Sequence, residues 1–558
     1  MKVLLALVAL PYATGATDFN AEAKVVVDGM TIDELIGQMT QVNINYGIQD
    51  QNAKKVVDPS KVEELANQRI GSYLNSPFSL STAANVTGWS ATEWRSAISQ
   101  IQTTHKATTG HPIIYGHYIG YSGSASGKDR DPVTLSKHEL LNIFMLPFKA
   151  VIDAGIMTGM DSYIALNGVP TSANRQTSID LLRTDLKFDG FLVSDWEEIY
   201  MMEYFHKYAT DRQGTVFKVM SNSSLDMSMV PTDTSFIGYM RPLYDSGKVS
   251  LDRIRKSAQR IVKVKLQLNL HNDPVLGADL ANALGDFDSQ SAALETAKAS
   301  LVLVKNTNNV LPLDPAKYFY FTGPSIDDIG LICGGWTIHW QGVQGTSNFP
   351  AYGRTIQADM SGVVGNATRA QFYQGVNIDG TWWDINLAKQ KAQADNYTLP
   401  TGLTNYVKAL ATTGTKIILV LVEGRPRLLS GMADLAAAVL NAGLPCELGG
   451  EAISSVLFGS TNPSGKLPLT YPKSTDLINL ATPYYGRAEK KMRWATECQH
   501  LKNELIDAAE AIRPQARHET NELKGSLYLK DHIIAQLKRD FAEINTVLST
   551  SCSTRNTA

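Results

Sequence analysis

The chain has 558 residues, more than one ordinary domain holds, so two or three domains are expected. Apolar residues make up 44% and charged residues 19%, as in packed globular proteins, and the net charge of −3 implies no basic face. We therefore expect no nucleic-acid partner and, because no run of about 18 apolar residues occurs, no membrane span.

The first residues have the pattern of a signal peptide. Lys2 precedes an apolar run that ends at Leu10, and small residues follow. We expect residues 1–16 to be a signal peptide, cleaved between about Ala13 and Thr17, and the protein to be secreted; a buried first strand is the alternative. Four Asn-x-Ser/Thr glycosylation sites suit this route, at Asn85, Asn222, Asn366 and Asn396.

The next 250 residues or so alternate between helical and strand patterns. Thr31 and Glu34 form a predicted capping box at the start of a helix. A long amphipathic helix is predicted from Leu251 to Leu268. Short apolar runs predict buried parallel strands at Ile70–Leu74, Pro112–Tyr115, Ala154–Met160 and Phe188–Ser194.

Residues 273–288 have poor periodicity and are predicted to be a linker, and a second α/β unit is predicted after it. Its strand candidates are Ser300–Val304, Tyr318–Thr322 and Lys416–Val422, and a helix is predicted over Glu451–Phe458. From Ala488 onward the pattern changes to heptad-like spacing, rich in Lys, Glu, Ala and Gln. We expect a helical tail there, with a possible helical partner.

The most informative segment is FDGFLVSDWEEI, residues 188–199. An apolar strand ends there at Asp195, which is followed by Trp196. In a β/α barrel, the carboxyl ends of the strands hold the catalytic groups, and a carboxylate beside an aromatic ring suits attack on a sugar. The alternative is that Asp195 caps the next helix.

Six further segments resemble motifs of glycoside hydrolase family 3. They are residues 117–132 (HYIGYSGSASGKDRDP), 160–170 (MDSYIALNGVP), 298–313 (KASLVLVKNTNNVLPL), 334–342 (GGWTIHWQG), 422–429 (VEGRPRLL) and the run from Leu444 through 458–472 (FGSTNPSGKLPLTYP). They follow the family's order, and the resemblance covers residues 31–485.

The resemblance implies a β-glucosidase that retains configuration and uses no cofactor or metal. Asp195 would be the nucleophile, and His117, Tyr163, Trp196 and Trp336 would bind the substrate. For His117 and Tyr163, packing in the core or a loop is the alternative role.

The implied fold is an incomplete TIM-like β/α barrel followed by an α/β/α sandwich. The corresponding boundaries are 17–272 for the barrel, 273–296 for the linker, 297–487 for the sandwich and 488–558 for the helical extension.

Three departures from the family follow. Residues 111–116 run directly into His117, so several barrel units are absent and Gly116 replaces the family's Lys. The acid/base Glu is missing from residues 388–400, and Glu423 and Glu451 nearby are interpreted as structural. The helical tail stands where the family has a β-sandwich domain. Because these deletions fall inside recognisable motifs, they indicate a mis-predicted or degenerate gene product.

We therefore expect hydrolysis of terminal β-D-glucosyl residues from a β-glucoside or oligosaccharide. Two alternatives are a catalytically impaired carbohydrate-binding relic and an interaction protein that acts through its tail. The four cysteines show no metal-ligand spacing, which favours free thiols or a single bridge over a zinc site.

Overall fold

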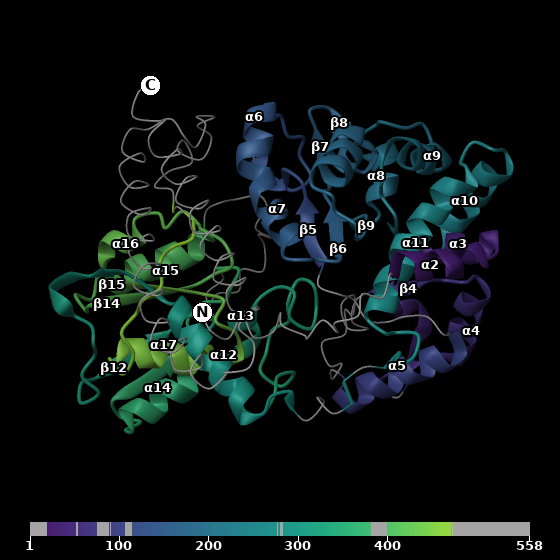
Figure 1. The fold of residues 1–558 in the computed structure, drawn as a ribbon. Coiled ribbons are helices and arrows are strands. Elements are labelled where there is room, and N and C mark those ends of the chain that lie inside the picture. The colour runs from purple at the N-terminus through teal and green to yellow at the C-terminus, as the bar shows by residue number, and fades with distance from the viewer. Residues whose placement is uncertain are drawn as a thin grey trace, which may run out of the picture. The chain divides into compact units, whose positions relative to one another are not determined.

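The computed structural model describes residues 19–51, 54–74, 89, 91–105, 114–125, 127–230, 232–275, 277–278, 283–380, 399–469 and 471. The chain divides into units Met1–Asn479 and Leu480–Ala558, and the described residues all lie in the first. Helices and strands alternate through it, so the α/β class is confirmed (Figure 1). The expected signal peptide, residues 1–16, and tail, residues 488–558, lie outside the described residues. No helix within the described ranges is both long and apolar enough to span a membrane.

Six short parallel strands organise the N-terminal half. Strand β1 (Thr40–Asn43) pairs with β4 (Ser72–Leu74) on one side and β10 (Ser228–Met229) on the other. Strand β6 (Thr158–Asp161) likewise lies between β5 (Ile114–Tyr118) and β9 (Phe191–Val193). A parallel bridge between Val193 and Met227 joins the two groups at β9 and β10. The strand candidates of this half are thereby confirmed, each within a few residues.

Helices follow or precede these strands, as a parallel arrangement requires. In chain order they are α2 (Phe19–Asp28), α3 (Ile32–Gln38), α4 (Pro59–Asn67), α5 (Ala91–His105), α6 (Lys137–Glu139), α7 (Met145–Asp153), α8 (Glu198–Tyr204), α9 (Arg212–Asn222), α10 (Ser235–Asp245) and α11 (Leu251–Gln267). Two π-helical stretches, Leu140–Phe144 and Gln176–Asp185, accompany α7 and precede β9. Two small antiparallel pairs complete the half: β2 (Ile48–Gln51) with β3 (Lys54–Val57), and β7 (Ala165–Leu166) with β8 (Val169–Pro170).

Local sequence explains where several of these elements begin. The predicted capping box is present at α3, because Thr31 accepts the backbone N–H of Glu34 and Glu34 bonds back to Thr31. Helix α11 matches the predicted amphipathic helix, and Ser250 caps its N-terminus. Its apolar face contributes fully buried Ile254 and Ile261 to the core, which also contains the side chains of β9.

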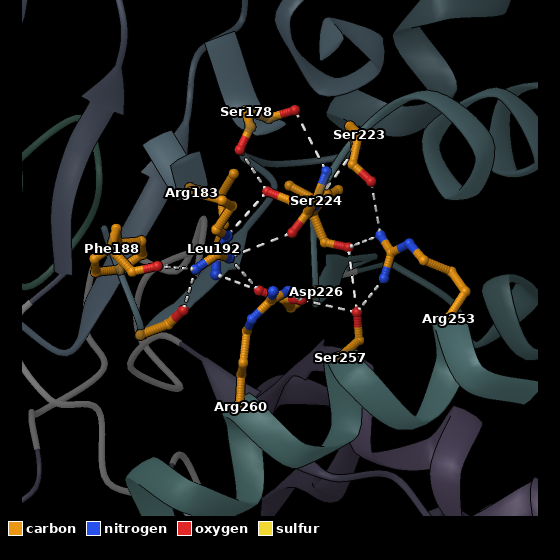
Figure 2. A network of polar contacts seen from close by, with 12 residues as sticks. Ser178, Arg183, Phe188, Leu192, Ser223, Ser224, Asp226, Arg253, Ser257 and Arg260 are labelled. Carbon is orange, nitrogen blue, oxygen red and sulfur yellow. Dashed lines mark hydrogen bonds and ion pairs between the residues drawn. The ribbon is translucent and has the colours of Figure 1, made fainter. Parts of the chain in front are cut away.

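A buried ionic network ties β9 to β10 and α11 (Figure 2). The carboxylate of Asp226, which is 1% exposed, contacts Arg183 at 2.6 Å and Arg260 at 2.9 Å. It also accepts the hydroxyl of Ser257 at 2.8 Å and the backbone N–H of Leu192 at 3.0 Å. Burial alone would raise the pKa of Asp226, but the surrounding guanidinium groups hold it below its usual value. The strand that leads to Asp195 is therefore anchored at Leu192.

The C-terminal half contains a second sheet and its own core. Strands β11 (Val302–Asn306), β15 (Ala436–Gly443) and β14 (Ile417–Val422) form a sheet in that order, with β15 parallel to β14 and antiparallel to β11. Strands β12 (Phe319–Thr322) and β13 (Ala370–Tyr373) form a parallel pair. In Figure 1, helices α15 (Thr401–Ala411) and α16 (Met432–Leu435) lie on one side of β14 and β15. Helices α12 (Phe287–Ser300), α14 (Ile356–Val364) and α17 (Gly449–Leu457) lie on the other.

Of the three helices on the second side, α17 is the one that the sequence predicts. Helix α17 (Gly449–Leu457) matches the expected helix within two residues, and α14 spans Ile356–Val364. Helix α12 (Phe287–Ser300) occupies the second half of the expected linker, residues 273–296. Its hydrophobic periodicity is weak, and Ala297 is its single buried residue. The helix is instead stabilised by the cap at Asp286 and by packing against α17.

Candidate active site

Strand β9 delivers Asp195 to its carboxyl end. Phe191, Leu192 and Val193 are buried, and Ser194 continues the pairing by donating its N–H to the carbonyl of Met227. The chain then leaves the strand, and Asp195 follows with 8% of its surface exposed. A carboxylate is thus held at the end of a buried strand, where barrel-type enzymes keep their catalytic groups.

The polar contacts of Asp195 orient its carboxylate. Oδ1 accepts the backbone N–H of Trp196 at 2.6 Å, and Oδ2 lies 2.6 Å from Nε2 of His117. Helix α8 begins at Glu198 with Glu197 as its N-cap residue, and that cap makes no side-chain hydrogen bond. Asp195 is therefore not the N-cap of α8, so the alternative of a helix-capping role does not apply.

His117, Tyr163 and Trp196 gather around Asp195. His117 comes from β5, and its ring lies 4.7 Å from that of Tyr121 and 6.3 Å from that of Tyr163, measured between centroids. The Tyr163 hydroxyl donates to the backbone carbonyl of Trp196 at 2.9 Å. Four of the five predicted site residues are therefore brought together in the N-terminal half.

The junction between Gly116 and His117 lies inside β5, so this strand continues through the point where several barrel units are expected to be absent. A Cβ atom at position 116 would lie 2.9 Å from the Cβ of Met160 on the paired strand. Glycine is therefore required for the close approach of β5 and β6.

Trp336, the fifth predicted residue, belongs to the C-terminal half. It follows α13 (Ile329–Cys333), and its side chain is 82% exposed. Its backbone N–H donates to the carbonyl of Trp340 at 3.1 Å, which closes the loop. Exposed aromatic faces of this kind suit stacking against apolar C–H surface.

Two buried carboxyl groups that the sequence analysis did not single out lie next to Asp195. Glu198, 2% exposed, accepts the backbone N–H of Asp195 at 2.9 Å, and Asp161, 1% exposed, contacts the carboxyl group of Glu198. Burial raises the pKa of Asp161 well above its ordinary value, and burial together with the charge of Asp161 does the same for Glu198. For Asp161 the available signal was a single acidic residue at the end of a predicted strand, whereas Glu198 stands in the acidic cluster Asp195–Glu198.

A further set of residues shapes the side of the site near Tyr163. The guanidinium carbon of Arg130 lies 4.4 Å from the Tyr163 ring centroid, and the Tyr121 hydroxyl donates to Asp129. Burial and then the nearby charge of Asp195 raise the pKa of the Tyr163 phenol. The phenol therefore stays protonated and acts as a hydrogen-bond donor at neutral pH.

The expected gap in the acid/base segment, residues 388–400, falls almost wholly outside the described residues. Of the glutamates near it in sequence, half-buried Glu423 accepts the hydroxyl of Tyr471 at 2.7 Å, and that hydroxyl accepts Nδ2 of Asn441 at 2.5 Å. Burial raises the pKa of Glu423. These contacts give Glu423 a structural partner within the C-terminal sheet.

Comparisons with known proteins identify both halves. Residues 93–264 match the Glycosyl hydrolase family 3 N terminal domain, and residues 301–504 match the Glycosyl hydrolase family 3 C-terminal domain. The chain is 33% identical over 401 residues to the lysosomal beta glucosidase of Dictyostelium discoideum. The aligned region covers 66% of this chain and 48% of that relative. It is 29% identical over 411 residues to the periplasmic beta-glucosidase of Salmonella typhimurium, and this aligned region covers 65% of the chain and 52% of that relative. The chain thus spans about half the length of these curated relatives.

Solved structures support the same fold. A β-glucosidase from Listeria innocua in complex with glucose aligns with a TM-score of 0.64 at 18% identity, over 84% of this chain and 79% of the other. An exo-1,3/1,4-beta-glucanase mutant from a Pseudoalteromonas species aligns with a TM-score of 0.66 at 17% identity, over 85% of this chain and 94% of the other. At these identities the likeness shows the fold alone.

Proposed function

Because the chain belongs to glycosyl hydrolase family 3, we propose that it descends from and acts as a retaining β-glucosidase, which removes terminal non-reducing β-D-glucosyl residues. The observation that carries this proposal is Asp195 at the end of β9, where Oδ1 accepts the Trp196 N–H and Oδ2 lies 2.6 Å from Nε2 of His117. A carboxylate held at Oδ1 by a backbone donor and packed against His117 has little orientational freedom to lose when it attacks an anomeric carbon.

In the proposed first step, an Asp195 oxygen attacks the anomeric carbon as the bond to the leaving oxygen breaks, and a glycosyl ester forms. Water then attacks the same carbon, and Asp195 leaves as a carboxylate, so two inversions give net retention. The sugar would stack on Trp196 and Trp336, while His117 and Tyr163 border the nucleophile. The family's acid/base Glu, which would donate the leaving-group proton, is missing from residues 388–400.

We also propose a barrel-and-sandwich architecture for the two halves. We take the six parallel strands, in the order β4–β1–β10 and β9–β6–β5, as an incomplete TIM-like barrel. The strand order is open between β4 and β5, and the family material that the sequence lacks would follow Gly116, inside β5. The C-terminal half would be the α/β/α sandwich, and residues 488–558 a helical extension that offers a surface to a helical partner.

We further propose that the protein enters the secretory route and carries N-linked sugars. The charged start and short apolar run support this, and so do Asn222 and Asn366, the two described acceptor asparagines, since both are exposed. N-terminal sequencing of the exported protein should find cleavage between about Ala13 and Thr17. Recovery of intact Met1 would contradict it.

A second candidate, a carbohydrate-binding relic, is favoured by one contact. Nε2 of His117 lies 2.6 Å from Asp195 Oδ2 and occupies one of the directions from which that oxygen could meet a substrate. If His117 does not move aside, the pocket would bind a sugar without reacting with it.

Covalent trapping separates these two functions. The full chain would be incubated with 2,4-dinitrophenyl 2-deoxy-2-fluoro-β-D-glucoside, whose good leaving group needs no protonation and whose fluorine slows hydrolysis of the ester. We expect one fluoroglucosyl group per chain, on Asp195 by peptide mapping, and none on Asp195→Asn. Saturable glucose binding without labelling would support the relic instead.

A further inference from the structure

Cys333 and Cys446 lie beside each other in the C-terminal half, although they are far apart in the chain. Cys333 ends helix α13, and Cys446 begins the short 3-10 turn Cys446–Leu448 that precedes α17. Their sulfur atoms and a carboxylate oxygen of Glu447 all lie within 4.8 Å of one another. Cys333 is buried and Cys446 is exposed, so the pair has one sheltered and one accessible thiol.

The packing around the pair holds the two segments together. A Cβ atom at Gly449 would lie 2.6 Å from Cγ2 of Ile332, and one at Gly334 would lie 2.6 Å from Cδ1 of Leu444. The backbone carbonyl of Glu447 also accepts the N–H of Arg354 at 2.7 Å. The approach of the two sulfurs is thus set by close backbone packing on both sides.

The two thiols differ in chemistry. A hydrogen bond from Cys333 lowers the pKa of Cys446 to about 7, whereas that bond and burial raise the pKa of Cys333. Cys446 also has a φ of 62°, in the left-handed region that non-glycine residues seldom adopt. An accessible thiol with substantial thiolate character at neutral pH is a suitable nucleophile for thiol–disulfide exchange.

We propose that Cys333 and Cys446 form a dithiol site that a small-molecule disulfide, such as oxidised glutathione, converts into a disulfide bridge. The Cys446 thiolate attacks one sulfur of the reagent, forms a mixed disulfide and releases one glutathione thiolate. Cys333 then loses its proton and attacks the Cys446 sulfur, which releases the second glutathione. The two cysteines are oxidised by two electrons, and the reagent is reduced to two thiols.

A bridge accounts for these contacts better than a structural zinc site. Structural zinc takes four protein ligands, and the described residues gather three here. One of the three, Glu447, also bonds the hydroxyl of Tyr352, so its carboxylate has another partner. Thiol–disulfide exchange requires two thiols, an accessible one that attacks the reagent (Cys446) and a neighbouring one that resolves the mixed disulfide (Cys333).

The bridge would act on the loop that carries Trp336. Cys333 is followed directly by Gly334, Gly335 and Trp336, and Cys446 lies just beyond β15. Oxidation would therefore tie the start of the loop that carries Trp336 to the segment that follows the carboxyl end of β15. This chemistry is independent of the proposed glycosidase activity.

The test uses the full chain with Cys498→Ser and Cys552→Ser, so that two thiols remain. After oxidised glutathione, we expect a denatured sample to take up no polyethylene-glycol maleimide, and after dithiothreitol to take up two groups. Non-reducing peptide mapping of the unsubstituted chain should find Cys333 joined to Cys446, which requires no variant to fold.

Two single variants in that background probe the order of attack. Cys333→Ser should stop at a mixed disulfide of glutathione on Cys446, because no second thiol can resolve it. Cys446→Ser, the matched control, should leave the buried Cys333 unmodified in the native state. Two free thiols after oxidation would overturn the proposal. So would one zinc per chain that blocks maleimide until a chelator is added.

Discussion

The carboxyl groups of Asp161 and Glu198 contact each other in the interior, and Glu198 also accepts the backbone N–H of Asp195 at 2.9 Å. Two carboxylates this close and this buried cannot both ionise easily, so the pair retains protons that solvent-exposed carboxyls have lost. The turn that presents Asp195 therefore rests on a partly protonated pair.

This pair should make stability fall as pH rises. Its folded pKa values are raised, so its full contribution is present below the ordinary carboxyl range of about 4 and is lost as pH rises toward the folded values. Each retained proton steepens the loss by up to about 1.4 kcal/mol per pH unit. Asp161→Asn with Glu198→Gln should flatten the curve of Tm against pH between 5 and 8. Asp153→Asn with Glu63→Gln, both exposed, is the control, and parallel curves for all three proteins would refute this account.

The buried Asp226 network should be among the most sensitive parts of the fold. Asp226→Ala leaves Arg183, itself nearly buried, without its carboxylate, and losing one partner of such a pair costs about 3–5 kcal/mol. Asp189→Ala is the matched control, because the Asp189 side chain that pairs with Lys263 is 65% exposed and should contribute less than about 1 kcal/mol. Urea unfolding of both variants measures the difference. Equal losses would show that burial does not set the strength of these pairs.

Lys265 should produce the opposite pH dependence. Its ammonium group donates to Oε1 of Gln38 at 2.6 Å and to the carbonyl of Gly71 at 2.8 Å, and burial lowers its pKa from 10.5 to about 7. Between these values the unfolded chain binds more protons, so stability should rise with pH by up to about 1.4 kcal/mol per unit. Lys265→Met should lack this rise in calorimetry from pH 7 to 10, whereas the exposed Lys248→Met should keep it. If stability still rises with pH in Lys265→Met, another titrating group causes the rise.

Catalysis should depend strongly on the leaving group. General acid help is worth roughly 10²–10⁴ in rate, and its expected source is missing from the sequence. We therefore expect very low hydrolysis of dinitrophenyl β-glucoside and almost none of cellobiose, whose alkoxide must be protonated as it leaves.

Asp195→Asn tests the same prediction from the side of the nucleophile. It should abolish the remaining activity, because an amide is a far poorer nucleophile, while its oxygen can still accept the Trp196 N–H. Full-rate cellobiose hydrolysis would show that another acid has replaced the missing one. Activity unchanged by Asp195→Asn would remove Asp195 from the mechanism.

Sequence alone determined the features that depend on neighbouring residues. The cap at Thr31, the amphipathic helix α11 and the apolar strand that ends at Asp195 all follow from side-chain periodicity and short-range hydrogen bonding. It was less successful at α12, where a weak apolar pattern is stabilised by packing against a distant helix. The motif order also identified the family before any contact was known.

Only the tertiary structure decided which distant residues meet. His117 reaches Asp195 because β5 and β9 flank β6, and Asp161 reaches Glu198 because β6 ends beside the turn that follows β9. Cys333 and Cys446 meet because α13 packs against the turn after β15. Strand order and helix packing are set by burial of the whole apolar surface, which is a property of the assembled core and of no single segment.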